Sequence, residues 1–191
     1  SKLDETIQKA HDALEEMSLP KYVAVIKEFC ISDLSQFYLE ARKDVLYCGT
    51  EDERLNIGVC MSIIYNNLCA LCYPIMPFAV TEFIRSKSPS IVLSIPKGIS
   101  KPKEDWSKIR SFRHKVNSML EQHGGNKLEL SIVVPSEYVA PYFVYGVSQV
   151  LCSTNAIDEP YVVEMDGDKC VRCWRHLSVN VDKLCQRCEN V

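Results

Sequence analysis

Four cysteines in the last part of the sequence have the spacing of a metal site. They are arranged as Cys170-x2-Cys173-x11-Cys185-x2-Cys188. A Cys-x2-Cys pair can direct two thiolates at one ion, and eleven intervening residues suffice for a turn or hairpin between the pairs. Four thiolates complete the tetrahedral shell of Zn²⁺ and leave no position for water, so we predict a structural zinc ion. The alternative is a set of buried or disulfide-bonded cysteines without metal.

The charge around these cysteines fits a metal site. A segment of this size has too little apolar core to fold unaided, so we expect metal binding and folding to be coupled. Four thiolates on a divalent cation leave a net negative charge of two units. Basic side chains outnumber acidic ones nearby by the same margin, so they can serve the metal rather than a ligand. They are Lys169, Arg172, Arg175, Lys183 and Arg187, against Asp168, Asp182 and Glu189.

Two further features could contact a polyanion. Trp174 directly follows a predicted ligand and could stack on an exposed base, with Arg172 and Arg175 on phosphates. It could equally cover the metal site as a large apolar side chain, and the sequence leaves both interpretations open. The second feature is the charge of residues 101–127. This stretch contains seven basic and three acidic side chains, although the whole chain has a net charge of −3. This excess predicts either a polyanion-binding surface or a solvated helix face.

No catalytic residues are predicted. The sequence contains no glycine-rich phosphate loop, no Gly-x-Ser-x-Gly motif and no paired carboxylates. Cys69 and Cys72 have a knuckle-like spacing, but they lie in an apolar helical pattern that favours core packing. The many other scattered cysteines indicate a reducing compartment, and we expect a cytoplasmic protein. Apolar stretches are interrupted well short of ~18 residues, so we expect no membrane-spanning helix.

Apolar periodicity predicts an α-helical bundle over residues 1–88. Its helices cover the first segment, residues 20–42, residues 51–73 and a short stretch near residues 78–84. The pattern of the first helix is already running at Leu3 without a preceding cap, which suggests a piece of a longer chain. In the third helix we expect one apolar face to point inward, formed by Leu55, Val59, Ile63, Ile64, Leu68 and Leu71.

A small α+β module is predicted for residues 89–167, and the zinc-binding segment for residues 168–191. A basic helix over 104–122 is followed by alternating apolar residues at 128–134, the period of a half-buried strand. Further strands are expected at 91–95, 147–153 and 161–165, with a turn at Asp166-Gly167. The fold class is therefore mainly α: a helical bundle, a small α+β module and a four-cysteine zinc finger.

Several of these motifs resemble bacterial-type isoleucyl-tRNA synthetases. The tail motifs KCVRCW at 169–174 and LCQRC at 184–188 are similar to the C-terminal zinc segment of that family. Two further stretches resemble the anticodon-binding helical domain of that family. One runs from Phe29 to Tyr47 and contains DLS at 33–35 and FYL at 37–39, and the other is PIMPF at 74–78. The chain departs from the family at residues 81–84, where two acidic residues and a tryptophan are usual.

The resemblance implies the tRNA-binding C-terminal portion of an isoleucine–tRNA ligase, without its nucleotide-binding and editing domains. The full enzyme would join isoleucine to its tRNA using ATP and Mg²⁺, while this portion, a non-catalytic monomer, would hold the anticodon stem-loop. The alternative is a zinc-stabilised interaction module of another enzyme, such as a DNA-repair glycosylase-type finger. The candidate RNA contacts are Trp174, Arg175, Arg172 and Arg187 in the tail, with Arg110 and Arg113 on the basic helix.

Overall fold

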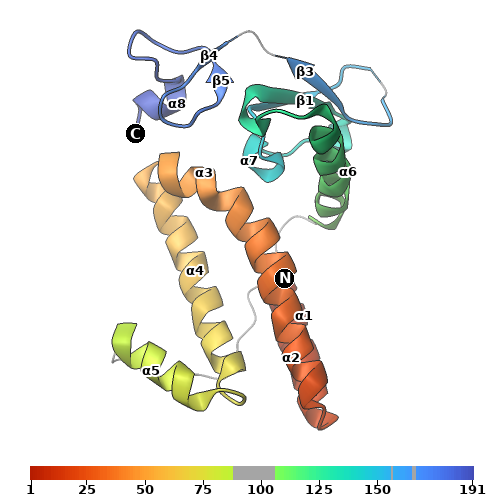
Figure 1. Ribbon diagram of the computed structural model, residues 1–191, viewed down its shortest axis with the longest axis vertical. Helices are drawn as coiled ribbons and strands as arrows, with labels where there is room; N and C mark the ends of the chain where they lie inside the picture. Colours follow the sequence, from red (N-terminus) through yellow and green to blue (C-terminus); the bar gives the residue numbers. More distant parts are fainter. Residues whose placement is uncertain (88–105, 156, 165–166) are drawn as a thin grey trace. The chain divides into compact units, whose positions relative to one another are not determined.

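The computed structural model describes residues 1–87, 106–155, 157–164 and 167–191 (Figure 1). The chain forms two compact units. The helical unit contains Ser1–Leu39 and Leu55–Lys103, and the sheet unit contains Glu40–Arg54 and Glu104–Val191. The sheet unit thus groups residues 40–54 with the C-terminal part of the chain. The predicted boundaries at residues 88 and 167 stay predictions, and the expected strand at 91–95 lies outside the described residues.

The helical unit has the predicted helices. They are α1 (Lys2–Glu15), α2 (Leu19–Glu28), the π-helix η1 (Phe29–Leu39), the greater part of α4 (Glu51–Cys72), and α5 (Pro77–Lys87). Its core joins Ala10 and Ala13 of α1 to Tyr22 and Ile26 of α2 and to Leu71 of α4. The Tyr22 hydroxyl donates a hydrogen bond of 2.6 Å to the Leu71 carbonyl oxygen. That bond satisfies one of the carbonyls that a helix end leaves without an intrahelical partner.

Two expectations about helix limits are wrong. Ser1 caps α1, because its hydroxyl accepts a hydrogen bond of 3.4 Å from the backbone N–H of Asp4. The helix expected to end near residue 42 runs through η1 into α3 (Glu40–Cys48), since no proline or glycine interrupts the sequence before Gly49. At Gly49 the chain must turn: a Cβ there would lie 2.3 Å from the Val45 carbonyl oxygen, so only glycine fits.

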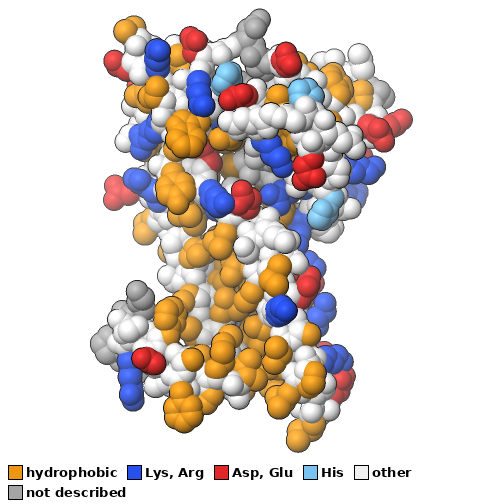
Figure 2. Space-filling model, viewed as in Figure 1, with side chains coloured by type: hydrophobic (Ala, Val, Ile, Leu, Met, Phe, Trp, Pro, Cys, Tyr) orange, Lys and Arg blue, Asp and Glu red, His pale blue; other side chains and the backbone are white. Residues whose placement is uncertain are grey.

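The inward face predicted for α4 is only partly correct. Leu71 is buried, but Leu55 and Val59 are 66% and 54% exposed. Figure 2 shows apolar side chains gathered over α4 and α5. Helix α4 is long and apolar enough to cross a membrane, contrary to our expectation that no helix of the chain would be. The criterion is weak evidence, because core helices of soluble proteins also meet it. Cys69 packs in the core with Val80 and Ile84 of α5, as predicted for this knuckle-like pair.

The sheet unit is built on a three-stranded sheet of order β2-β1-β3. Its strands are β1 (Leu130–Val134), β2 (Gln149–Cys152) and β3 (Tyr161–Glu164), with β2 parallel and β3 antiparallel to β1. Helix α6 (Ser107–His123) contributes apolar side chains to the core around this sheet. All five residues of β1 are buried, so the prediction of a half-buried strand is wrong. Leu130, Ile132 and Val134 pack in the core to which α6 contributes, and Ser131 and Val133 on the opposite face are buried as well, so other parts of the chain cover both faces of this strand.

Short elements complete the sheet unit. The 3₁₀ helices η2 (Lys127–Glu129) and η3 (Ser136–Tyr138) flank β1, and α7 (Tyr142–Tyr145) precedes β2. In the cysteine segment, β4 (Asp168–Lys169) pairs with β5 (His176–Leu177), and α8 (Gln186–Glu189) follows Cys185. The β4-β5 ladder brackets the first cysteine pair, and α8 carries Cys188. The whole is mainly helical, with a small sheet module and a C-terminal cysteine cluster, as predicted.

Candidate metal centre and its surroundings

The four predicted ligands come together. The Sγ atoms of Cys170, Cys173, Cys185 and Cys188 all lie within 4.8 Å of one another, and all four residues are buried. The Sγ atoms of Cys173 and Cys185 are 3.8 Å apart. Tetrahedral sulfur ligands at about 2.3 Å from Zn²⁺ are about 3.8 Å from one another. The cluster therefore fits a tetrahedral ion, with thiolates from both Cys-x2-Cys pairs.

Backbone hydrogen bonds hold the two cysteine pairs in place. In the first pair, the Cys170 N–H donates to the Arg175 carbonyl and the Trp174 N–H to the Cys170 carbonyl, both at 2.9 Å. Before the second pair, the Asn180 side-chain oxygen accepts from the Leu184 N–H at 2.9 Å. The two pairs are tied together where the Cys185 N–H donates to Cys170 Sγ at 3.4 Å. A backbone amide aimed at a ligand sulfur is the usual environment of a metal-bound thiolate.

The pKa shifts of the buried thiols favour a bound cation. Burial raises the pKa of the Cys170 thiol, but backbone hydrogen bonds at Cys173, Cys185 and Arg172 outweigh it and lower the pKa to about 6. Burial raises the pKa of Cys188 strongly, and its neighbouring thiols raise it further. One thiolate thus forms readily, whereas a full set of four repels itself in a buried site. A divalent cation among the sulfurs would remove that repulsion.

Apolar side chains other than Trp174 cover the cysteines. Leu177, Val179 and Leu184 pack against the cluster, together with Cys48 from α3. Trp174 is 59% exposed, and the Lys169 ammonium lies 6.0 Å from the centroid of its ring. Its backbone has φ of 64°, in the left-handed region. The ring therefore lies at the surface of the segment rather than over the sulfur cluster.

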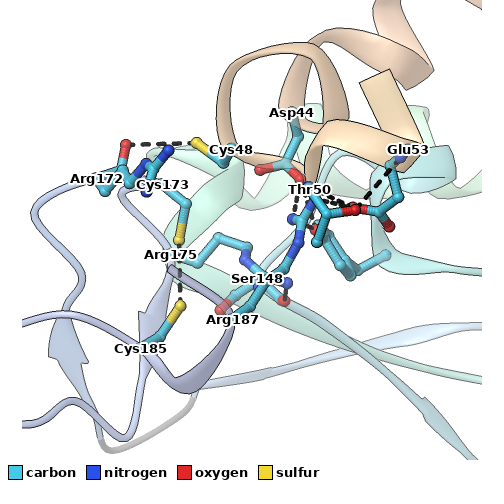
Figure 3. A network of polar contacts seen from close by, with 11 residues as sticks. Asp44, Cys48, Thr50, Glu53, Ser148, Arg172, Cys173, Arg175, Cys185 and Arg187 are labelled. Atoms are coloured by element: carbon cyan, nitrogen blue, oxygen red, sulfur yellow. Dashed lines mark hydrogen bonds and ion pairs between the residues drawn. The ribbon is translucent and has the colours of Figure 1, made fainter. Parts of the chain in front are cut away.

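Two of the predicted RNA contacts point into the protein instead (Figure 3). Arg175 is 6% exposed: its guanidinium donates to the Ser148 carbonyl at 3.2 Å and stacks 3.6 Å from the centroid of the Tyr142 ring. Arg187 donates to the Asp44 carboxylate and to the Tyr142 hydroxyl. The Tyr142 hydroxyl in turn donates to Asp44 at 2.5 Å. Both arginines are thus engaged inside the sheet unit.

The pKa directions agree with this arrangement. Burial raises the pKa of the Tyr142 hydroxyl, and its hydrogen bond to Asp44 raises it further. Burial alone would lower the pKa of Arg187, but the hydrogen bond to Asp44 and the nearby negative charge raise it instead. Tyr142 therefore stays neutral and Arg187 stays charged. The group is a partly buried arrangement of the Asp44 carboxylate, the Tyr142 phenol and two guanidinium groups, and Arg187 also lies 3.9 Å from the Glu53 carboxylate.

The remaining predicted contacts lie nearer the surface. Arg172 is exposed, and its guanidinium donates to the Cys188 carbonyl at 3.3 Å. Arg110 and Arg113 on α6 are half-buried, and burial lowers the pKa of Arg113. The exposed cations of this helix are instead Lys108 and Lys115. Of the six candidates, Trp174 and Arg172 have the exposed side chains.

Three residues of this region were missed from the sequence. Asp44 and Cys48 lie on α3, and Tyr142 begins α7. They meet residues of the cysteine segment that are far away in the chain: Asp44 and Arg187 are 143 positions apart, and Cys48 and Arg172 are 124 apart. No local spacing could indicate such pairs. Only the similarity of the run containing Lys43 and Asp44 to a known helical domain pointed at this stretch.

Comparison with known proteins gives the family context. Residues 1–129 match the family model described as the anticodon-binding domain of tRNA ligase. The isoleucine–tRNA ligase of Zymomonas mobilis is 29% identical over 99% of this chain and 23% of its own length. Those of Thermosynechococcus vestitus and Exiguobacterium sibiricum are 27% and 26% identical, over 98% and 100% of this chain. The chain spans about a quarter of the length of these relatives.

Proposed function

This chain belongs to the family of anticodon-binding domains of tRNA ligases, and we propose that it binds the anticodon stem-loop of isoleucine tRNA as part of an isoleucine–tRNA ligase. The observation that carries the proposal is the family match over residues 1–129 followed by an intact four-cysteine cluster. The similarity to isoleucine–tRNA ligases over nearly the whole chain supports isoleucine as the amino acid.

In this proposal the chain positions tRNA and performs no chemistry itself. The longer enzyme would attach isoleucine to the tRNA using ATP and Mg²⁺, in catalytic and editing domains outside these residues. We propose that Cys170, Cys173, Cys185 and Cys188 hold one zinc ion, which supplies a structural cross-link between the two cysteine pairs. We also propose a cytoplasmic monomer. The similarity to isoleucine–tRNA ligases supports the ligase assignment, and the four converging thiols support the metal site.

The proposed RNA contact of the cysteine segment centres on Trp174. Proteins read RNA sequence mainly in single-stranded loops, where unstacked bases can stack on aromatic side chains. The exposed Trp174 ring offers such a face, with the Lys169 ammonium beside it and the exposed Arg172 close in sequence. On α6, Lys108 and Lys115 are better placed for phosphate contacts than the half-buried Arg110 and Arg113. We assign Arg175 and Arg187 to the interior of the protein.

A titration would test the proposal. The purified, zinc-loaded chain is titrated with isoleucine tRNA and with an unrelated tRNA at the same salt concentration, since salt alone changes such affinities greatly. We expect tighter binding of isoleucine tRNA. A duplex DNA oligonucleotide is included because a glycosylase-type finger would prefer DNA. Equal affinity for both tRNAs would remove the isoleucine assignment, and stronger binding to the duplex would favour the DNA-binding alternative.

A further inference from the structure

A polar junction joins α3 to the cysteine segment (Figure 3). Asp44 accepts hydrogen bonds from the Tyr142 hydroxyl at 2.5 Å and from the Arg187 guanidinium. The side chains of Arg187 and Asp44 are only 23% and 19% exposed. Arg187 stands between two predicted metal ligands, two positions after Cys185 and one before Cys188. The cation of the junction therefore belongs to the metal-binding loop itself.

We propose that metal bound by the four cysteines positions helix α3 through the Arg187–Asp44–Tyr142 junction. Arg187, Asp44 and Tyr142 act here as positioning residues, and metal occupancy and the stability of α3 are coupled. The proposal rests on the metal site of the proposed function. It goes further, because it assigns to the metal an effect on a helix that contributes no ligand. That helix, Glu40–Cys48, lies within the residues that match the anticodon-binding family.

Both cysteine pairs reach the same tyrosine. Arg175, two positions after Cys173, stacks on the Tyr142 ring, with its guanidinium carbon 3.6 Å from the ring centroid. Arg187, from the second pair, donates to the hydroxyl of the same ring. The two arginines can meet one residue only while the two pairs are held together. In a segment with so small an apolar cluster, the metal is what holds them.

Helix α3 contacts the cysteine segment through residues of two successive helical turns. Residues four apart lie on one face of a helix, so Asp44 and Cys48 face the same side. Cys48 is 5% exposed and packs against the four predicted ligands, and its thiol donates to the Arg172 carbonyl at 3.7 Å. One polar and one packing contact therefore depend on the same loops. When these loops lose their metal, the Asp44 carboxylate loses the Arg187 cation while it is still bonded to Tyr142, and a partly buried charge without its partner is unfavourable.

The test follows α3 in the full chain with and without zinc. Zinc content is measured by elemental analysis, and backbone hydrogen exchange is followed in peptides covering residues 40–48. Alkylation of Cys48 by iodoacetamide is a second readout. We expect removal of zinc by a chelator to speed exchange in α3 at least tenfold and to make Cys48 reactive. The exposed Cys60 and Cys152 report reagent activity in both states.

The decisive variant is Asp44→Asn, with Asp52→Asn as the matched control at an exposed carboxylate of α4. With zinc bound, α3 of Asp44→Asn should exchange faster than in the wild-type chain, and the effect of zinc on the rate should shrink to the part that the Cys48 contact carries. A merely structural Asp44 would speed exchange equally in both metal states. Asp52→Asn should keep the full zinc effect. If Asp44→Asn fails to fold, as judged by circular dichroism, Tyr142→Phe removes one hydroxyl and tests the same junction.

The outcomes separate this inference from the proposed function. If the chain binds one zinc ion but hydrogen exchange in α3 does not depend on it, the coupling is overturned and the metal site stays intact. A zinc effect that keeps its full size in both Asp44→Asn and Tyr142→Phe would overturn the assigned residues. A chain that holds no zinc would overturn the metal site and the coupling together. None of these measurements depends on tRNA binding.

Discussion

Replacing Trp174 by alanine should weaken tRNA binding by a predictable amount. An aromatic side chain has up to about 250 Å² of surface, so the 59% exposed fraction leaves about 150 Å² available. A base stacked on one face would cover roughly half of this, or about 75 Å². At about 25 cal/mol per Å² the loss is about 2 kcal/mol, or ~30-fold in Kd. This lies within the ~1–3 kcal/mol usual for one stacked base.

The same replacement should leave the metal in place. Trp174 is outside the apolar cluster around the cysteines, which consists of Leu177, Val179, Leu184 and Cys48. Its positive φ is equally unfavourable for tryptophan and for alanine, so the backbone strain does not change on substitution. We therefore expect one zinc per chain in the variant. The slope of log Kd against log salt should also stay unchanged, because no charge is removed.

The assay measures tRNA affinity and zinc content in the same preparations. Trp174→Phe keeps an aromatic face and should retain most of the affinity. Tyr161→Ala, which removes a 49% exposed aromatic side chain from β3, is the control for general loss of surface area. If zinc and affinity are lost together in Trp174→Ala, the ring is structural and the stacking assignment is refuted.

Four other predictions concern the cysteine cluster, the lack of catalysis, two arginines and the core of the helical unit. Cys170→Ser or Cys185→Ser should lower zinc content well below one per chain, and unchanged content in both would contradict the four-cysteine site. The chain alone should show no isoleucine-dependent pyrophosphate exchange with ATP, and activity above background would place a catalytic site within it. Arg172→Ala should reduce the salt slope of tRNA binding by about one, whereas the buried Arg175→Ala should instead lower the denaturation midpoint. Tyr22→Phe should lower the free energy of unfolding in urea by ~1–3 kcal/mol, because it leaves the buried Leu71 carbonyl at the end of α4 without its donor. A smaller loss would mean that water replaces the hydroxyl.

The convergence of the four cysteines was predictable because the information is local. A Cys-x2-Cys spacing determines by itself that two sulfurs can meet one ion, and the structure gathers all four within 4.8 Å. The positions of most helices were also predictable, since apolar residues that recur every three to four positions indicate a helix. Both kinds of signal are contained in short stretches of chain.

What could not be predicted depends on partners far away in sequence. The pattern of β1 indicated one buried face, yet both faces are covered, because Ser131 and Val133 are buried as well as Leu130, Ile132 and Val134. Leu55 and Val59 have the periodicity of a core helix face but are exposed in the structure. The junction of Asp44 with Arg187 spans 143 positions and follows no periodicity at all. In each case the deciding fact is which element lies next to the residue.

The basic residues of the cysteine segment illustrate why position decides their role. If zinc is bound as proposed, four thiolates leave two net negative charges, and two of the five cations, Arg175 and Arg187, have side chains that lie mainly inside the sheet unit. The other three, Lys169, Arg172 and Lys183, are exposed together with Asp168, Asp182 and Glu189. The surface of the segment is thus close to neutral. If it binds RNA, the affinity must come from stacking on Trp174 more than from charge, and most of the salt dependence must arise elsewhere. The exposed Lys108 and Lys115 of α6 are the cations of the sheet unit that we expect to supply it.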